Sequence, residues 1–89
     1  MRVYKLEIGA YRDFERDFTY IQSNFLPRVG EIIDNYKIKV CDEYDNIMTF
    51  IQKLEVQSVH YCLYEDGSSM PIVYANVIKC EEVKGDSNE

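Results

Sequence analysis

The residues of this chain that could carry out chemistry are a single histidine and three cysteines. His60 and Cys62 lie two positions apart in LEVQSVHYCLYE, which puts both side chains on one face of a strand. A histidine beside a thiol can act as general base to a nucleophile. No motif places these two residues as such a pair, and a lone histidine on a strand more often has a structural role. The sequence therefore predicts a protein that is not an enzyme and has no catalytic residues.

The remaining chemistry-bearing residues argue against a metal centre or a disulfide framework. The cysteines, Cys41, Cys62 and Cys80, are odd in number and show no CxxC or Cys/His spacing. The acidic run at 42–45 lacks the ligand spacing of an EF-hand, and its aspartates are better suited to capping a helix. We therefore expect no metal, no cofactor and three reduced thiols. Cys62 and Cys80 lie on paired strands and could be neighbours, which would allow oxidation on storage.

Arg28 is the residue best suited to bind an anion. It lies in NFLPRVGEII, where Pro27 forbids a helix and Gly30 can adopt a positive φ, so a tight corner is predicted. An arginine on such a corner can hold a phosphate or a carboxylate with two hydrogen bonds. Alternatively, Arg28 pairs with Glu31 across the corner at the surface. Arg28 and Tyr61 are the candidate ligand-binding residues.

Length and charge limit the class of protein. A chain of 89 residues predicts one compact domain at 1–83, followed by a disordered tail at 84–89. The net charge is −6 and is uneven, because residues 1–41 carry seven basic and six acidic side chains, whereas 42–89 carry three and ten. Direct nucleic-acid binding is not expected, since the acidic half repels phosphates. The excess of acidic residues either keeps the protein soluble or forms a face that binds a basic partner.

The sequence also predicts a cytoplasmic protein without a membrane partner. It begins MRVYKLEI, which lacks the basic and then apolar regions of a signal peptide. No apolar run approaches the roughly 18–20 residues that cross a bilayer. The odd number of cysteines is typical of a reducing compartment.

The elements that position these residues centre on a long hairpin. Segments 54–65 and 71–83 are rich in β-branched and aromatic residues, and Asp-Gly-Ser-Ser at 66–69 forms a turn between them. The apolar positions change face near 57–58, which predicts a β-bulge. Further strands are expected at 1–8, 31–34 and 36–40. Segment 17–23 is expected to be a strand after a loop at 12–16, with one amphipathic helix over 11–23 as the alternative.

A helix is expected between the short strands and the hairpin. CDEYDNIMTFIQK begins with acidic residues that suit the positive end of a helix dipole, and Ile47, Phe50 and Ile51 form an apolar stripe. The predicted fold class is α+β, with a small bent antiparallel sheet or open SH3-like β-barrel and one packed helix.

The last strand is apolar on both faces, which predicts self-association. Val73, Ala75 and Val77 should pack on the helix stripe. The other face then lacks cover unless a second copy meets it as a homodimer. The candidate partner-binding residues on that face are Ile72, Tyr74 and Ile78. Tyr74 is the expected anchor, because tyrosine is enriched at interfaces.

Two short motifs suggest a family. FLPRVGE at 25–31, followed by LEVQSVH at 54–60, resembles a pattern in small accessory proteins of tailed phages and prophages. In those proteins, a PRVGE-type corner leads to the strands of a small SH3-like β-barrel. Members with known roles bind and disable host or defence components. The resemblance covers about a third of the chain.

The leading function expected from these observations is that of a non-enzymatic binding protein. The resemblance implies a phage or prophage inhibitor that blocks a host or defence protein in the host cytoplasm. The alternative is a homo-oligomeric sponge that sequesters a nucleotide-like small molecule at a subunit junction lined by Arg28 and Tyr61. A small enzyme is a weaker alternative.

Overall fold

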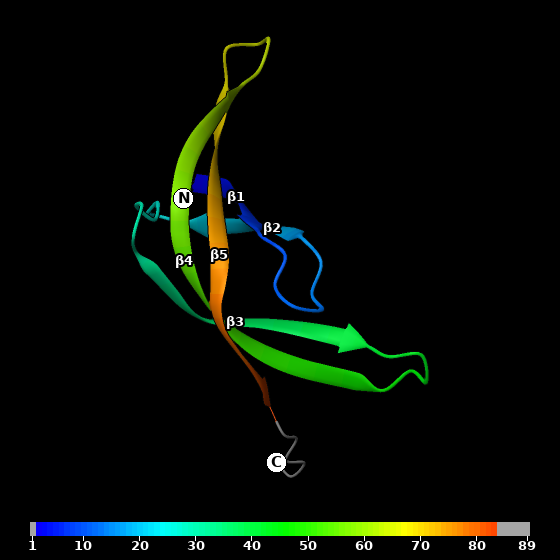
Figure 1. Cartoon of the computed structure of the whole chain (residues 1–89). Coiled ribbons are helices and arrows are strands. Elements are labelled where there is room, and N and C mark those ends of the chain that lie inside the picture. The colour runs from blue at the N-terminus through cyan, green and yellow to red at the C-terminus, as the bar shows by residue number, and fades with distance from the viewer. Residues whose placement is uncertain (1, 84–89) are drawn as a thin grey trace.

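The computed structural model describes residues 2–83. In this part of the chain, all of the regular secondary structure consists of β-strands. They are β1 (Arg2–Ile8), β2 (Asp17–Ser23), β3 (Ile32–Cys41), β4 (Ile47–Leu63) and β5 (Ser69–Val83). They form one mixed sheet in the order β2-β1-β5-β4-β3, which bends strongly but stays open (Figure 1). Only β1 and β5 run parallel. The predicted α+β class, with a packed helix and an SH3-like barrel as one form, is therefore wrong.

The segment predicted as a helix forms a turn and the first part of β4. The N–H of Asp42 donates to the carbonyl of Asn46 over 3.0 Å. The Asp42 carboxylate accepts the N–H of Tyr44 at 2.8 Å and that of Asn46 at 2.9 Å. The aspartate thus caps a hairpin turn, because short acidic side chains favour turns as readily as helix starts.

Pairing with β3 decides the conformation of the residues that follow this turn. Ile47, Thr49 and Ile51 are β-branched at alternate positions, which favours a strand. Antiparallel partners run from Cys41 opposite Ile47 to Tyr36 opposite Gln52. The helical stripe read from the sequence is therefore overridden by tertiary pairing.

Other predicted elements are confirmed. Segment 17–23 is a strand that pairs antiparallel with β1, so the alternative helix at 11–23 is wrong. The β4–β5 hairpin turns at 64–68, with Gly67 at φ 88°. Its register shifts between Val56 and Ser58, at the predicted bulge. The two short strands predicted at 31–34 and 36–40 are one strand, β3, with an irregularity at Asn35, whose φ is 59°.

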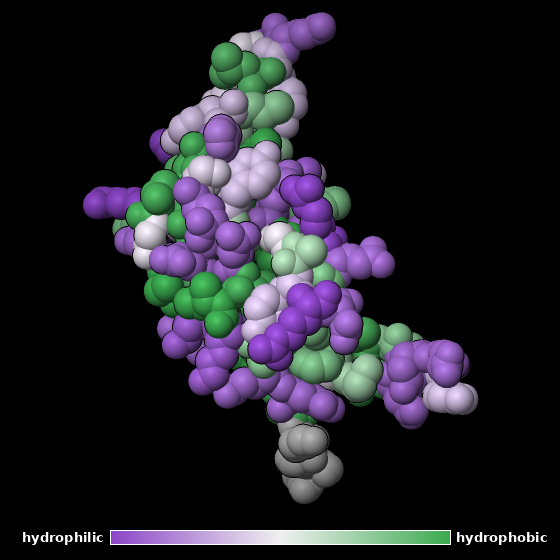
Figure 2. Space-filling view, viewed as in Figure 1, coloured by the Kyte–Doolittle hydropathy of each residue, from purple (hydrophilic) through white to green (hydrophobic). Residues whose placement is uncertain are grey.

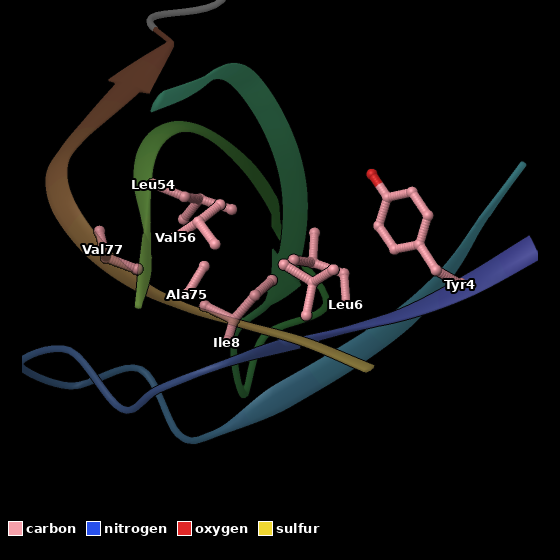
Figure 3. Close-up of a cluster of buried hydrophobic side chains, with 8 residues drawn as sticks. Tyr4, Leu6, Ile8, Leu54, Val56, Ala75 and Val77 are labelled. Carbon is pink, nitrogen blue, oxygen red and sulfur yellow. The ribbon is translucent and has the colours of Figure 1, made fainter. Parts of the chain in front are cut away.

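The core lies on the inner side of the bend (Figure 3). Its eight buried apolar side chains are Tyr4, Leu6 and Ile8 from β1, Leu54 and Val56 from β4, and Val73, Ala75 and Val77 from β5. The β5 residues face the core as predicted, but they pack against β1 and β4 and not against a helix. Successive side chains point to opposite faces of a strand, so the intervening residues of β1 and β5 face outward.

The PRVGE corner docks on β4. Gly30 has φ 91°, as the sequence predicts. The N–H of Gly30 donates to the carbonyl of Val56, and the N–H of Val56 donates to the carbonyl of Glu31. The Glu31 carboxylate accepts the backbone N–H of Arg28 at 2.7 Å. The corner therefore continues the ladder between β3 and β4.

The molecule measures 47 × 26 × 26 Å. Two hairpins project from its body (Figure 1). One is the β4–β5 tip and the other is the β3–β4 tip. Within residues 2–83 there is no helix that could span a membrane. The tail predicted at 84–89 lies outside the described residues.

Candidate binding surface and cleft

Three neighbouring strands place two rows of side chains on the face opposite the core. The first row is Tyr20 on β2, Lys5 on β1 and Ile72 on β5, which are cross-strand partners. The second row is Phe18, Glu7 and Tyr74 on the same strands. We call these six residues the outer surface. Phe18 is 53 % exposed and Tyr20 is 56 % exposed.

Lys5 and Glu7 hold the centre of the outer surface. Their Nζ and Oε2 atoms are 3.1 Å apart. The same Nζ lies 4.5 Å from the centroid of the Phe18 ring, which meets the Tyr20 ring edge to face at 5.8 Å. The hydrogen bond to Glu7 is the main cause that raises the pKa of Lys5. The lysine therefore keeps its charge among aromatic rings.

His60 borders this surface and has a packing role. Its ring meets the ring of Tyr74 edge to face, with centroids 5.3 Å apart. Desolvation first, and then the neighbouring Cys62, raise the pKa of Tyr64. The side chains that contact the histidine and the cysteine therefore include tyrosines, Tyr74 and Tyr64.

The structure brings together two of the three candidate partner-binding residues. Ile72 and Tyr74 are half-buried members of the outer surface. Ile78 is 46 % exposed and lies where the register shifts, because Lys53 pairs with Lys79 and Leu54 with Val77. Ile78 therefore belongs to a bulge further along β5.

Sequence reasoning missed the other members of the outer surface. Their position depends on the parallel pairing of β1 with β5, which sets Lys5 beside Ile72 and Glu7 beside Tyr74. No local pattern predicts a pairing between the two ends of a chain. The one available signal was the alternation in β2, which puts Phe18 and Tyr20 on the same face.

The two candidate ligand-binding residues occupy different parts of the fold. Arg28 is exposed in the corner that docks on Val56. Tyr61 is 58 % exposed and lies nearer the β4–β5 turn, opposite Pro71. Neither residue lines the cleft beside Gln52.

That cleft, which we call the Gln52 cleft, lies between the 9–17 segment and the inner face of β3 and β4. Its volume is about 210 Å³. Its walls include Ile8, Phe14, Tyr36 and Gln52. Gln52 is 2 % exposed, and its Nε2 donates to the Sγ of Cys80 over 3.6 Å, a long contact with a weak acceptor. The amide thus presents a buried polar group at an otherwise apolar floor.

Charges of both signs border the Gln52 cleft. Arg16 and Lys39 are balanced by Glu15 and Asp17. Burial, and then the charge of Asp17, raise the pKa of the Tyr36 phenol. The cleft therefore offers aromatic walls, one amide and a rim without net charge.

The thiols are free in the described structure, and their arrangement differs from the prediction. Cys41 is exposed, and Cys62 and Cys80 are half-buried. Cys62 lies opposite Met70, whereas Cys80 lies opposite Gln52, so the expected proximity of Cys62 and Cys80 is wrong. Over residues 2–83, no group of three or more histidine, cysteine or carboxylate side chains is arranged to hold a metal ion.

Comparison with protein-family models, curated proteins and solved structures gave no match. The outer surface and the Gln52 cleft are two features of the described residues whose side chains could recognise another molecule.

Proposed function

We propose that this chain is a non-enzymatic binding protein that acts by covering a surface of another protein. The observation that carries this proposal is the outer surface, where Phe18 and Tyr20 remain about half exposed beside Ile72 and Tyr74. Aromatic side chains combine large contact area with few rotatable bonds, and they are enriched at protein interfaces. Exposed aromatic side chains beside a charged pair are typical of the mixed polar and aromatic surface of a protein interface.

The proposed partner is a host or defence protein with a basic rim. The resemblance to phage accessory proteins supports a host or defence protein as the partner. The charge distribution of the chain supports a basic rim on that partner. The β3–β4 turn carries Asp42, Glu43 and Asp45, and the β4–β5 turn carries Glu65 and Asp66. Figure 2 shows the far end of the projecting β3–β4 hairpin as hydrophilic. Acidic groups at the periphery steer a basic partner toward the aromatic centre.

Site-specific photo-crosslinking in bacterial cells tests this proposal. A benzophenone amino acid replaces Tyr20 on the outer surface or, as the control, Phe25, which is 82 % exposed in the corner between β2 and β3. A defined adduct with another protein from position 20 only, lost when Tyr74→Asp is added, supports the proposal. The same adducts from both positions, or none from position 20, would overturn it.

Small-molecule sequestration is a second candidate, which the Gln52 cleft favours. A volume of about 210 Å³ is below the range of about 300–1,000 Å³ that holds drug-sized ligands. The balanced rim disfavours the phosphates of a nucleotide. The amide of Gln52 can both donate and accept, as it would to the edge of a base. The ligand class is therefore a small neutral planar molecule, such as a nucleobase, and the binding residue is Gln52 in place of Arg28 and Tyr61.

Calorimetric titration with adenine and with adenosine monophosphate tests the second candidate. Adenine should bind the wild type at least as tightly as the monophosphate, and Gln52→Leu should weaken its binding tenfold or more. Gln57→Leu is the control, because Gln57 is exposed at the bulge. Equal binding of adenine to wild type and Gln52→Leu excludes the cleft, as does the absence of binding at millimolar adenine.

A further inference from the structure

We infer that the outer surface also binds a second copy of this chain, about a two-fold axis that passes between Lys5 and Glu7. This inference rests on the proposed function in one respect, namely that both use the outer surface. The observation behind it is the register of the two rows. Each row has one residue on each of β2, β1 and β5, and the central residues of the two rows carry opposite charges.

The symmetry of two facing sheets leaves two simple arrangements. A two-fold axis that lies between the surfaces and runs across the strands reverses the strand direction and exchanges the two rows. Each strand then faces its own copy. An axis that runs along β1 instead preserves the rows and brings β2 opposite β5 of the second copy.

Charge selects the first arrangement. With the axis across the strands, Lys5 faces Glu7 of the second copy, and Glu7 faces Lys5. With the axis along β1, Lys5 faces Lys5 and Glu7 faces Glu7, which juxtaposes like charges. The selected arrangement also sets Tyr20 against Phe18 and Ile72 against Tyr74, so every position of one row meets a compatible side chain.

The small size of the surface makes this dimer weak. Three strands spaced by about 4.8 Å, and rows two residues apart, span only about 10 by 7 Å between side-chain origins. The total buried area therefore stays below the roughly 1,200–2,000 Å² of a stable complex. A monomer–dimer equilibrium in the micromolar range or weaker is expected. A second copy then masks the aromatic side chains and yields to a partner that binds them more tightly.

Charge exchange between two variants tests whether Lys5 and Glu7 lie in the interface. Sedimentation velocity should show a concentration-dependent dimer for the wild type. Lys5→Glu alone and Glu7→Lys alone should each weaken it tenfold or more, because each brings four like charges together. An equimolar mixture of the two variants should recover association at wild-type strength, since the acidic surface of one then faces the basic surface of the other.

A mixture of wild type with the double variant Lys5→Glu, Glu7→Lys tests the arrangement. With the axis across the strands, like charges meet in the mixed dimer, so each protein should associate with itself only. A preference for mixed dimers would overturn this arrangement.

Lys79→Glu is the matched control. Lys79 forms the same kind of pair with Glu81, at 3.2 Å on the same sheet, but outside the two rows. Lys79→Glu should leave the monomer–dimer equilibrium unchanged. Circular dichroism should show that every variant is folded. A monomeric wild type at about 1 mM overturns the inference, as does a mixture of the two single variants that fails to associate. Neither result affects an adduct between position 20 and another protein, so the proposed function is tested separately.

Discussion

The backbone N–H of Gly30 donates to the carbonyl of Val56 across 2.9 Å. This contact joins the corner between β2 and β3 to the middle of β4. The N–H of Val56 is also satisfied, because it donates to the carbonyl of Glu31 at 3.0 Å. Since Val56 is 1 % exposed, unmet backbone groups at this point would destabilise the fold. The corner is therefore part of the sheet.

Replacing the glycine of this corner should strain the backbone. At φ +91°, a β-branched side chain is disfavoured even though no atom lies within 4 Å of the added Cβ. We expect Gly30→Val to lower the free energy of unfolding by more than about 1 kcal/mol, which lowers the melting temperature by roughly 4–8 °C. Gly30→Asn, the control, should lose less. Melting of Gly30→Val within a degree of the wild type would contradict this account.

Two leucines of β4 should respond very differently to truncation. Leu54 is 0 % exposed and Leu63 is 78 % exposed. Leu54→Ala should destabilise by about 2–5 kcal/mol, since it leaves a cavity at the centre of the core. Leu63→Ala should change stability by about 0.5 kcal/mol or less. Urea denaturation measures both, and similar midpoints for the two variants would show that the core is misplaced.

The turn between β3 and β4 should make the free energy of unfolding depend on pH in the acidic range. Hydrogen bonds, chiefly from the N–H of Asn46, lower the pKa of Asp42. Because the folded-state pKa is the lower one, the stabilisation is complete above the unfolded-state value of about 3.9 and disappears as the pH falls through the folded-state value.

Asp42→Ala should therefore have a lower melting temperature than the wild type near neutral pH. The difference between the two melting temperatures should narrow once the pH falls below about 4. Melting temperatures across that range provide the measurement. Glu43→Ala removes a carboxylate of the same turn that does not accept these hydrogen bonds, and it is the control. A difference for Asp42→Ala that stays constant into strong acid would assign the loss to something other than the carboxylate charge.

Outer-surface tyrosines should control self-association. Tyr74→Asp places an unpaired charge opposite Ile72 of the second copy, so it should weaken the dimer tenfold or more in light scattering. Tyr44→Asp makes the same chemical change at the exposed β3–β4 turn and should have no effect. A dimer that tolerates Tyr74→Asp would place the interface on another face.

The thiols should remain free within each chain. The pairing of Cys62 with Met70 and of Cys80 with Gln52 separates the two cysteines by ten positions along β5, from 70 to 80. That spacing, about 33 Å of strand, exceeds the reach of a disulfide. Thiol titration of unfolded protein should find three groups. Slow oxidation should link chains through exposed Cys41, and Cys41→Ser should abolish the linkage; an intrachain bridge would refute the register.

Local signals in the sequence were sufficient for much of the fold. The turn around Gly67, the bulge before Ser58 and the corner at Gly30 each depend on one or two residues with a strong conformational preference. The strand at 17–23 follows from alternation alone. These features could be predicted because their physical cause lies within a few positions of the chain.

Features set by distant contacts could not be predicted in the same way. Residues 47–54 fit a helical stripe and a strand equally well in polarity, and only β3 and β5 on either side decide between them. The outer surface likewise depends on Lys5 meeting Ile72 from the other end of the chain. The buried Gln52 reads as an ordinary polar residue until its neighbours are known.

The parallel pairing of β1 with β5 has a consequence for synthesis. Leu6 and Ile8 emerge from the ribosome 67 residues before their partners Val73 and Ala75. Until then, the β1–β2 hairpin has an unpaired edge and an uncovered apolar face. An isolated two-stranded hairpin of this kind is at best marginally stable in water. The chain should thus gain its structure late and in a single slow step, in milliseconds to seconds. A nascent chain stalled before residue 69 should be sensitive to proteases along its whole length.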